Sequence, residues 1–172
     1  NTKQRVFNQT FDQMGLFSEK PNMIFSHQHN DLYKTAINIA KDNLYFGVGV
    51  KNFRHECGLD KYKISEFSCS THPHNTYIQL LAELGSIGFF FGLTLLMFIF
   101  VIILKHFLCL IRGKYYFTDF QICLISAILV SLWPIAPTGN LFNNWLNIIY
   151  YFPVGILLWS LDQKPKFNQK NQ

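Results

Sequence analysis

Long apolar runs follow a polar first part of the chain. No charged residue occurs between Glu83 and Lys105, or between Asp119 and Asp162. A membrane-spanning helix needs about 20 mostly apolar residues, so the first run is long enough for one span and the second for two spans with a turn. We therefore predict a mainly α-helical, integral membrane bundle. Its three spans are expected at about residues 85–104, 120–136 and 145–161.

Helices are also predicted in the polar part that precedes the first span. Apolar residues recur at helical spacing over residues 2–17 and again over 31–42, which predicts an amphipathic helix in each range. Residues 51–70 show no such period and are predicted to be irregular. A third helix is expected over 75–84, with Pro73 at its start, because proline is favoured at the first position of a helix. This helix leads into the first span.

The composition fits a membrane protein and argues against other classes. Hydrophobic residues make up 49% of the chain and charged residues only 15%, against about 25% in soluble domains. The formal net charge is +5, but the charges gather outside the apolar runs. These values argue against a disordered chain, a collagen-like fibre and a nucleic-acid-binding domain, so no nucleic acid is expected as a partner.

Basic residues in short loops predict how the chain crosses the membrane. The 105–119 loop and the 162–172 tail each carry three Lys or Arg residues and one acid, whereas the 137–144 turn carries none. Lys and Arg mark the cytoplasmic side of short loops. We therefore expect this loop and the polar tail inside, residues 1–76 as a periplasmic loop region with short helices, and residues 77–161 as the three spans.

Two short motifs carry glycines at fixed spacing. In the first, a His-Asn pair is followed after nine residues by Gly-x-x-Gly; the second is a Gly-x-Gly-x-x-x-Phe turn. Their positions are His74, Asn75, Gly85 and Gly88 for the first motif, and Gly47, Gly49 and Phe53 for the second. In this order, with the last spans after them, the two motifs resemble the O-antigen ligase and polymerase family over roughly residues 28–160.

This resemblance implies a polytopic glycosyltransferase of the GT-C type in the bacterial inner membrane, acting without a cofactor. Such enzymes take a glycan from a polyprenyl diphosphate carrier on the periplasmic face. A ligase joins it to a lipid A core sugar, a polymerase to a growing glycan, and an oligosaccharyltransferase to a protein. Family members have many more spans and this chain begins at Asn1, so we expect a C-terminal part whose upstream transmembrane helices are missing partners. A non-catalytic, transporter-like membrane protein is the alternative.

The chemistry of such a transfer selects candidate site residues. The acceptor hydroxyl needs a base, and the leaving diphosphate needs cations. We interpret His74 as the base, because a helix N-terminus lowers the pKa of a histidine and favours anions; alternatively, it only caps the helix and touches lipid headgroups. Arg54 is the leading diphosphate contact, since arginine binds phosphate bidentately; alternatively, it is a solvated surface residue. Lys51 and Arg5 are weaker candidates.

Three further positions of the motif helix are assigned to packing. Glu83 lies about 13 Å from His74 along a straight helix, so the two are not expected to touch. Gly85 and Gly88 are interpreted as positions where helices approach closely, rather than as ligand contacts.

The histidines and cysteines raise two further questions. His27, His29, His72 and His74 could together bind a metal, but no Cys or carboxylate stands at a zinc-like spacing beside them, so no metal is expected. Cys57 and Cys69 fall in the exported segment, where disulfides are stable, so we predict a bond between them; two free thiols are the alternative. The remaining cysteines, Cys109 and Cys123, are expected on the reducing cytoplasmic side.

Overall fold

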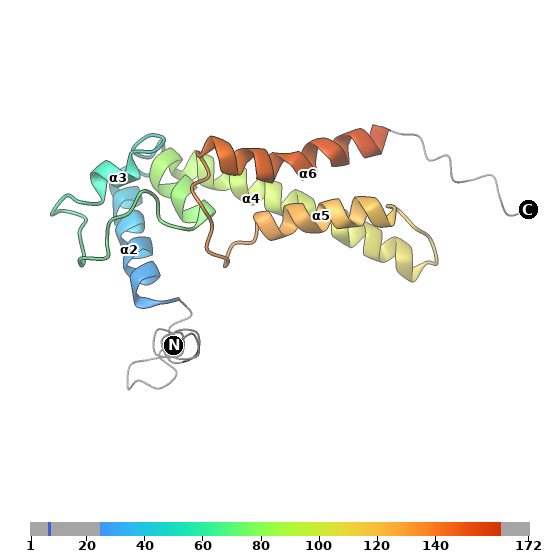
Figure 1. The fold of residues 1–172 in the computed structure, drawn as a ribbon, viewed down its shortest axis with the longest axis horizontal. Coiled ribbons are helices and arrows are strands. Elements are labelled where there is room, and N and C mark those ends of the chain that lie inside the picture. The colour runs from blue at the N-terminus through green and yellow to red at the C-terminus, as the bar shows by residue number, and fades with distance from the viewer. Residues whose placement is uncertain (1–6, 8–24, 163–172) are drawn as a thin grey trace, which may run out of the picture.

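The computed structural model describes residue 7 and residues 25–162, and the elements in this part are all helices. They are α2 (His27–Asp42), α3 (Phe53–Glu56), α4 (Thr76–Ile111), α5 (Asp119–Ser131) and α6 (Asn144–Asp162). The long part of α4 runs beside α5 and α6, whereas α2 and α3 lie at one end, with α2 across the direction of α4 (Figure 1). The predicted mainly helical class is confirmed. Except for residue 7, the helix predicted over 2–17 lies outside the described residues, as does the tail from residue 163.

Helix α2 has one apolar face, which packs against α3 and the beginning of α4. Ser26 is its N-cap, and the hydroxyl accepts a hydrogen bond from the His29 amide at 3.5 Å, in keeping with the preference of serine for this position. The face that includes Leu32, Ala36 and Ile39 is buried in a cluster with residues of α3 and α4. The helix predicted over 31–42 is thus confirmed with an earlier start, whereas the expectation of an irregular 51–70 segment missed α3.

Helix α4 is sharply broken at Gly85 and consists of two arms. Gly85 has φ 67° and ψ −161°, a combination that is essentially restricted to glycine. The short arm (76–84) packs on the long arm (86–111), and the rings of Tyr77 and Phe89 meet edge to face with centroids 6.5 Å apart. The motif helix and the first span are predicted on either side of Gly85, but the sharp turn between them is not predicted from the sequence.

The turn after α2 supplies hydrogen bonds at this break. Three backbone bonds run from Val48 to Ala82, from Gly49 to Glu83 and, in return, from Ser86 to Leu44, with N···O distances of 3.0, 2.9 and 2.7 Å. Buried backbone groups need such partners, and an interrupted helix leaves some of its own groups without them. The turn over 44–49 therefore completes the backbone hydrogen bonding of α4.

Gly47 and Gly85 allow the backbone of the 44–49 turn to approach the backbone of α4 within hydrogen-bonding distance. Gly47 has φ 66°, and a Cβ atom at this position would collide with the backbone of Glu83. A Cβ atom on Gly85 would collide with the carbonyl group of Tyr45. Glycine is used where two backbones approach in this way. The two glycine motifs, far apart in the sequence, therefore form a single structural unit. Gly88 is also crowded, since a Cβ there would meet the Leu84 side chain.

Helices α5 and α6 pack on each other and on the long arm of α4. Their buried apolar cluster consists of Ile99, Phe117, Ile125, Ile128 and Leu157. Many other large apolar side chains of these helices are exposed, among them Phe90, Phe91, Phe98, Ile149 and Trp159. Water-soluble monomers rarely expose an apolar surface of this extent. This surface therefore needs a covering other than water.

The helix bounds test the expected spans only in part. Among the described residues, α4 alone is long and apolar enough to cross a membrane. Helix α5 has 13 residues, about 20 Å, less than the ~30 Å of a hydrocarbon core. It ends at Ser131, before the predicted limit of residue 136, because the residue before Pro134 is driven out of the helical region. Helix α6 has 19 residues with Pro153 inside. The division into three spans remains a prediction.

Candidate functional site

The His-Asn motif lies in the loop that enters α4. Asn75 is the N-cap of α4, and its side-chain oxygen accepts hydrogen bonds from the amides of Tyr77 and Ile78 at 3.0 and 3.1 Å. Asparagine is among the preferred N-cap residues for this reason. The helix therefore begins after the cap. His74 is not in its first turn and Pro73 is not at its start, which corrects the sequence prediction for both residues.

The backbone of His74 adopts a left-handed conformation. Its φ is 57°, which is uncommon for a residue other than glycine and costs of the order of 1–3 kcal/mol. The His74 carbonyl accepts a hydrogen bond from the Thr138 amide at 2.9 Å. The side-chain amide of the neighbouring Asn75 donates to the Pro134 carbonyl at 2.7 Å. The turn that follows α5 thus holds the loop in this conformation.

Three histidine rings gather at this point. The ring centroids of His72 and His74 are 4.1 Å apart, and those of His29 and His74 are 5.8 Å apart. The Nε2 atom of His74 lies 3.4 Å from the Ser70 hydroxyl, and that of His72 lies 3.3 Å from the Thr138 carbonyl. His72 is buried and His74 is half-buried. We call His29, His72 and His74 the histidine cluster.

The surroundings of His72 and His74 favour their neutral imidazoles. Burial lowers the pKa of His74, and the charge of His29 lowers it further. Burial also lowers the pKa of His72; the charges of His74 and Arg54 act in the same direction, whereas the hydrogen bond to Thr138 opposes them. A neutral imidazole has a free acceptor nitrogen. His72 and His74 therefore offer nitrogens that can take a proton from a hydroxyl at neutral pH.

Arg54 stands at the edge of the histidine cluster. It is an exposed residue of α3, and its charge reaches His72. Neither of the ion pairs in the described part of the chain involves its guanidinium. A disulfide joins Cys57 to Cys69, with Cα atoms 5.0 Å apart. This bond ties the end of α3 to the segment that leads to His72, and so keeps Arg54 near the cluster.

The other sequence candidates stand apart from this cluster. Lys51 is exposed, with φ 63°, and within residues 25–162 no hydrogen bond or ion pair joins it to the histidines. Arg5 lies outside the described residues. Across the described part of the chain, no group of three or more His, Cys, Asp or Glu side chains is arranged to hold a metal ion. His27 instead pairs with Asp31 at 3.3 Å.

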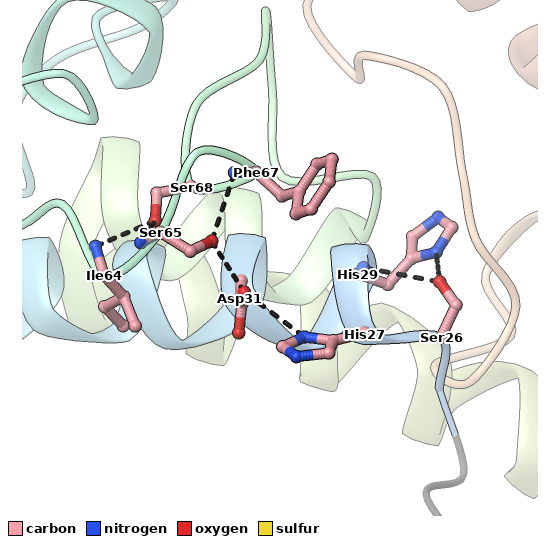
Figure 2. A network of polar contacts seen from close by, with 8 residues as sticks. All are labelled: Ser26, His27, His29, Asp31, Ile64, Ser65, Phe67 and Ser68. Atoms are coloured by element: carbon pink, nitrogen blue, oxygen red, sulfur yellow. Dashed lines mark hydrogen bonds and ion pairs between the residues drawn. The ribbon is translucent and has the colours of Figure 1, made fainter. Parts of the chain in front are cut away.

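A second polar network ties the 64–68 loop to α2 (Figure 2). The carboxylate of Asp31 is buried and accepts a hydrogen bond from the Ser65 hydroxyl at 2.6 Å, besides its pair with His27. The Ser68 hydroxyl accepts from the amides of Ile64 and Ser65 at 2.8 and 2.7 Å. This network fixes the fold of the loop that the Cys57–Cys69 disulfide closes.

Sequence reasoning missed two residues of the site. Ser70 contacts His74, and Thr138 contacts both His72 and His74. The sequence holds one hint, because Pro134 and Pro137 bracket a turn of restricted shape. No spacing rule connects this turn to a histidine 66 positions earlier, so only the folded chain shows that they meet.

Comparison with known proteins bears on the same region. Residues 28–93 match the family model described as O-antigen ligase. The matched segment contains both glycine motifs, the histidine cluster and Arg54, and it ends in the long arm of α4. No curated protein and no solved structure matches the chain.

Proposed function

We propose, since residues 28–93 match the family model described as O-antigen ligase, that this chain forms the reactive site of a membrane glycosyltransferase. The enzyme moves a glycan from a polyprenyl diphosphate carrier to an acceptor hydroxyl in the assembly of lipopolysaccharide or another surface polysaccharide. A lipid A core sugar is the acceptor in a ligase. A growing glycan or a protein hydroxyl takes its place in a polymerase or an oligosaccharyltransferase, which share the same chemistry.

One observation carries this proposal: at the start of the apolar helix, the histidine cluster lies within electrostatic reach of Arg54, which has no ion pair among the described residues. His74 is half-buried, close to a second imidazole, and held in an unusual backbone conformation. Such conformations persist where the surrounding structure enforces them and gather at active sites. Arg54 supplies a guanidinium that no carboxylate in the described residues neutralises. A base and a cation in the same region suit a hydroxyl acceptor and a diphosphate leaving group.

The proposed reaction divides the work between His74 and Arg54. The neutral imidazole of His74 takes the proton of the acceptor hydroxyl as its oxygen attacks the anomeric carbon of the glycan. The bond from that carbon to the diphosphate oxygen breaks, and its electron pair leaves with the polyprenyl diphosphate. Arg54 binds the charge that accumulates on the diphosphate, an interaction that strengthens in the transition state. His72 and Ser70 hold the base in place.

The proposed membrane enzyme has a defined topology. We expect three spans, with residues 1–76 in the periplasm and the C-terminus in the cytoplasm, because basic residues mark the short inner loops. In the full-length protein, reporters fused after Leu110 and after Gln172 should therefore be active only as cytoplasmic reporters. Periplasmic activity of a fusion at Gln172 contradicts the arrangement.

The role of Arg54 predicts that a lysine cannot replace it. Arg54→Lys keeps the charge but loses the planar fork that binds phosphate bidentately. We expect kcat/KM for the polyprenyl diphosphate donor to fall about tenfold or more, the usual effect of losing one charge-assisted hydrogen bond. The assay follows transfer of labelled glycan in membranes that contain the full-length protein, with expression matched.

Lys63→Ala is the matched control for Arg54, because Lys63 is an exposed cation of the disulfide-closed loop that follows α3. It should leave transfer unchanged. Equal rates for Arg54→Lys and the wild type would show that the diphosphate is bound elsewhere. Movement of the glycan without its covalent transfer to any acceptor would favour the transporter-like alternative.

A further inference from the structure

Glu83 is the one fully buried carboxylate in the described part of the chain, and it has neutral partners only. Its side chain is 0% exposed. One oxygen accepts a hydrogen bond from the Phe53 amide at 3.1 Å, and the other accepts from the Gln79 side-chain amide at 3.0 Å. Neither ion pair of the described residues includes it. Burying a carboxylate is costly unless specific hydrogen bonds compensate, so packing alone, the role expected from the sequence, does not account for Glu83.

The bond to Phe53 stabilises the beginning of α3. Phe53 is the first residue of this short helix, and the side chain of its N-cap, Asn52, makes no capping hydrogen bond. The first amides of a helix lack partners within the helix and need them from outside. Glu83 supplies that partner from α4. Arg54, the proposed diphosphate contact, is the next residue along α3.

Gln79 extends the same network to the turn after α5. Its side-chain nitrogen donates to Asn140 at 2.8 Å as well as to Glu83, and its side-chain oxygen accepts from the Leu141 amide at 3.1 Å. Gln79 is fully buried and all its bonds here are to protein groups. The turn that contains Asn140 is also the one that holds the histidine cluster through Thr138. Glu83 and Gln79 thus join α3, α4 and this turn.

We propose that Glu83 is a positioning residue, which holds Arg54 beside the histidine cluster by fixing the start of α3 and so sets the affinity for the diphosphate end of the lipid-linked donor. The inference rests on the proposed function. It assigns no contact between Glu83 and the substrate, since the carboxylate is enclosed by protein. Its effect on transfer must therefore pass through Arg54.

A double-mutant cycle in the full-length protein tests this route. Glu83→Gln keeps the size of the side chain but leaves one acceptor oxygen for two donors, the Phe53 amide and the Gln79 side-chain nitrogen, so the hold on the start of α3 is weakened. We expect it to lower kcat/KM for the donor about tenfold, as for one lost buried hydrogen bond, while KM for the acceptor stays unchanged. In an Arg54→Ala background the same change should have almost no further effect. Two independent effects that multiply would overturn the proposal.

Asp31→Asn is the matched control, because Asp31 is a buried carboxylate that is bonded to the 64–68 loop and not to α3. Its effect should be the same with and without Arg54. Hydrogen exchange gives a readout that needs no transfer assay: amides 53–57 should exchange faster in Glu83→Gln than in Asp31→Asn. Equal exchange in the two variants contradicts the positioning role even if the enzyme is a glycosyltransferase. If Arg54→Ala itself leaves transfer intact, both the positioning role and the proposed diphosphate contact are wrong.

Discussion

His74→Ala should lower glycan transfer by about 10² to 10⁴-fold, the usual contribution of a general base. The reason lies in the geometry: the His74 ring is half-buried, 4.1 Å from the His72 ring and next to the Ser70 hydroxyl. Transfer from the polyprenyl diphosphate donor should be measured in membranes, with insertion and expression matched to the wild type. Removing the imidazole removes the proton acceptor and leaves the rest of the loop in place.

Two further substitutions separate catalysis from folding. His74→Asn should fold as well as the wild type, because asparagine adopts the left-handed conformation of this position more readily than most residues, yet it should be inactive. His55→Ala removes an exposed histidine of α3 outside the cluster and should keep full activity. A His74→Ala protein that transfers glycan at the wild-type rate refutes the assignment of the base.

The pH dependence of transfer follows from the same site. The pKa of His74 is lowered by burial and by the charge of His29, so the neutral, active form persists to lower pH than for an ordinary histidine. Activity should therefore be maintained at the usual histidine pKa of about 6.5 and decline only at more acidic pH. A decline that begins above that value argues for a different titrating group.

Gly85→Ala should prevent the turn over 44–49 from docking on α4 and should destabilise the protein by about 3 kcal/mol or more. The backbone conformation of Gly85, φ 67° and ψ −161°, costs a residue with a side chain of the order of 1–3 kcal/mol by itself. The added methyl group would also collide with the Tyr45 carbonyl. Thermal unfolding of the purified full-length protein measures the loss.

Substitutions at two other glycines serve as controls that separate backbone strain from steric collision. Gly113 also has a positive φ, 68°, but a Cβ there meets no atom within 4 Å, so Gly113→Ala carries the strain of a positive φ without the collision. Gly155 lies within α6 with no atom within 4 Å, so Gly155→Ala should be neutral or stabilise by about 0.5–1 kcal/mol. The expected order of stability is Gly155→Ala, then Gly113→Ala, then Gly85→Ala. If Gly85→Ala and Gly113→Ala unfold at the same temperature, the close approach of Gly85 to the Tyr45 carbonyl contributes nothing to stability.

The sequence predicts the helical class and the region of the site, because both depend on short-range patterns. The charge-free run after Glu83 marks α4, and the spacing from His74 to Gly88 selects the site region. The break at Gly85 was missed, since two glycines three residues apart also fit close packing of straight helices. The second span is predicted to reach residue 136, whereas α5 ends at Ser131, because Pro134 interrupts the helix within the apolar run.

Contacts between distant segments were beyond the sequence for a different reason. Along a straight helix Glu83 lies far from His74, and no sequence pattern indicates its hydrogen bond to Phe53, the residue before Arg54. Thr138 stands in a turn without any charged residue, so no pattern of charge draws attention to it. Such contacts are determined by how the helices pack, and that packing cannot be predicted from a single sequence.

The bond between Thr138 and the histidine loop has a consequence for the order of events during synthesis. Thr138 leaves the ribosome 66 residues after His72, which corresponds to roughly 3–13 s at 5–20 residues per second. Until then the loop has no partner for its strained backbone, and the two imidazoles lack the support that brings them together. The site is therefore assembled only once α5 and the turn that follows it have been made.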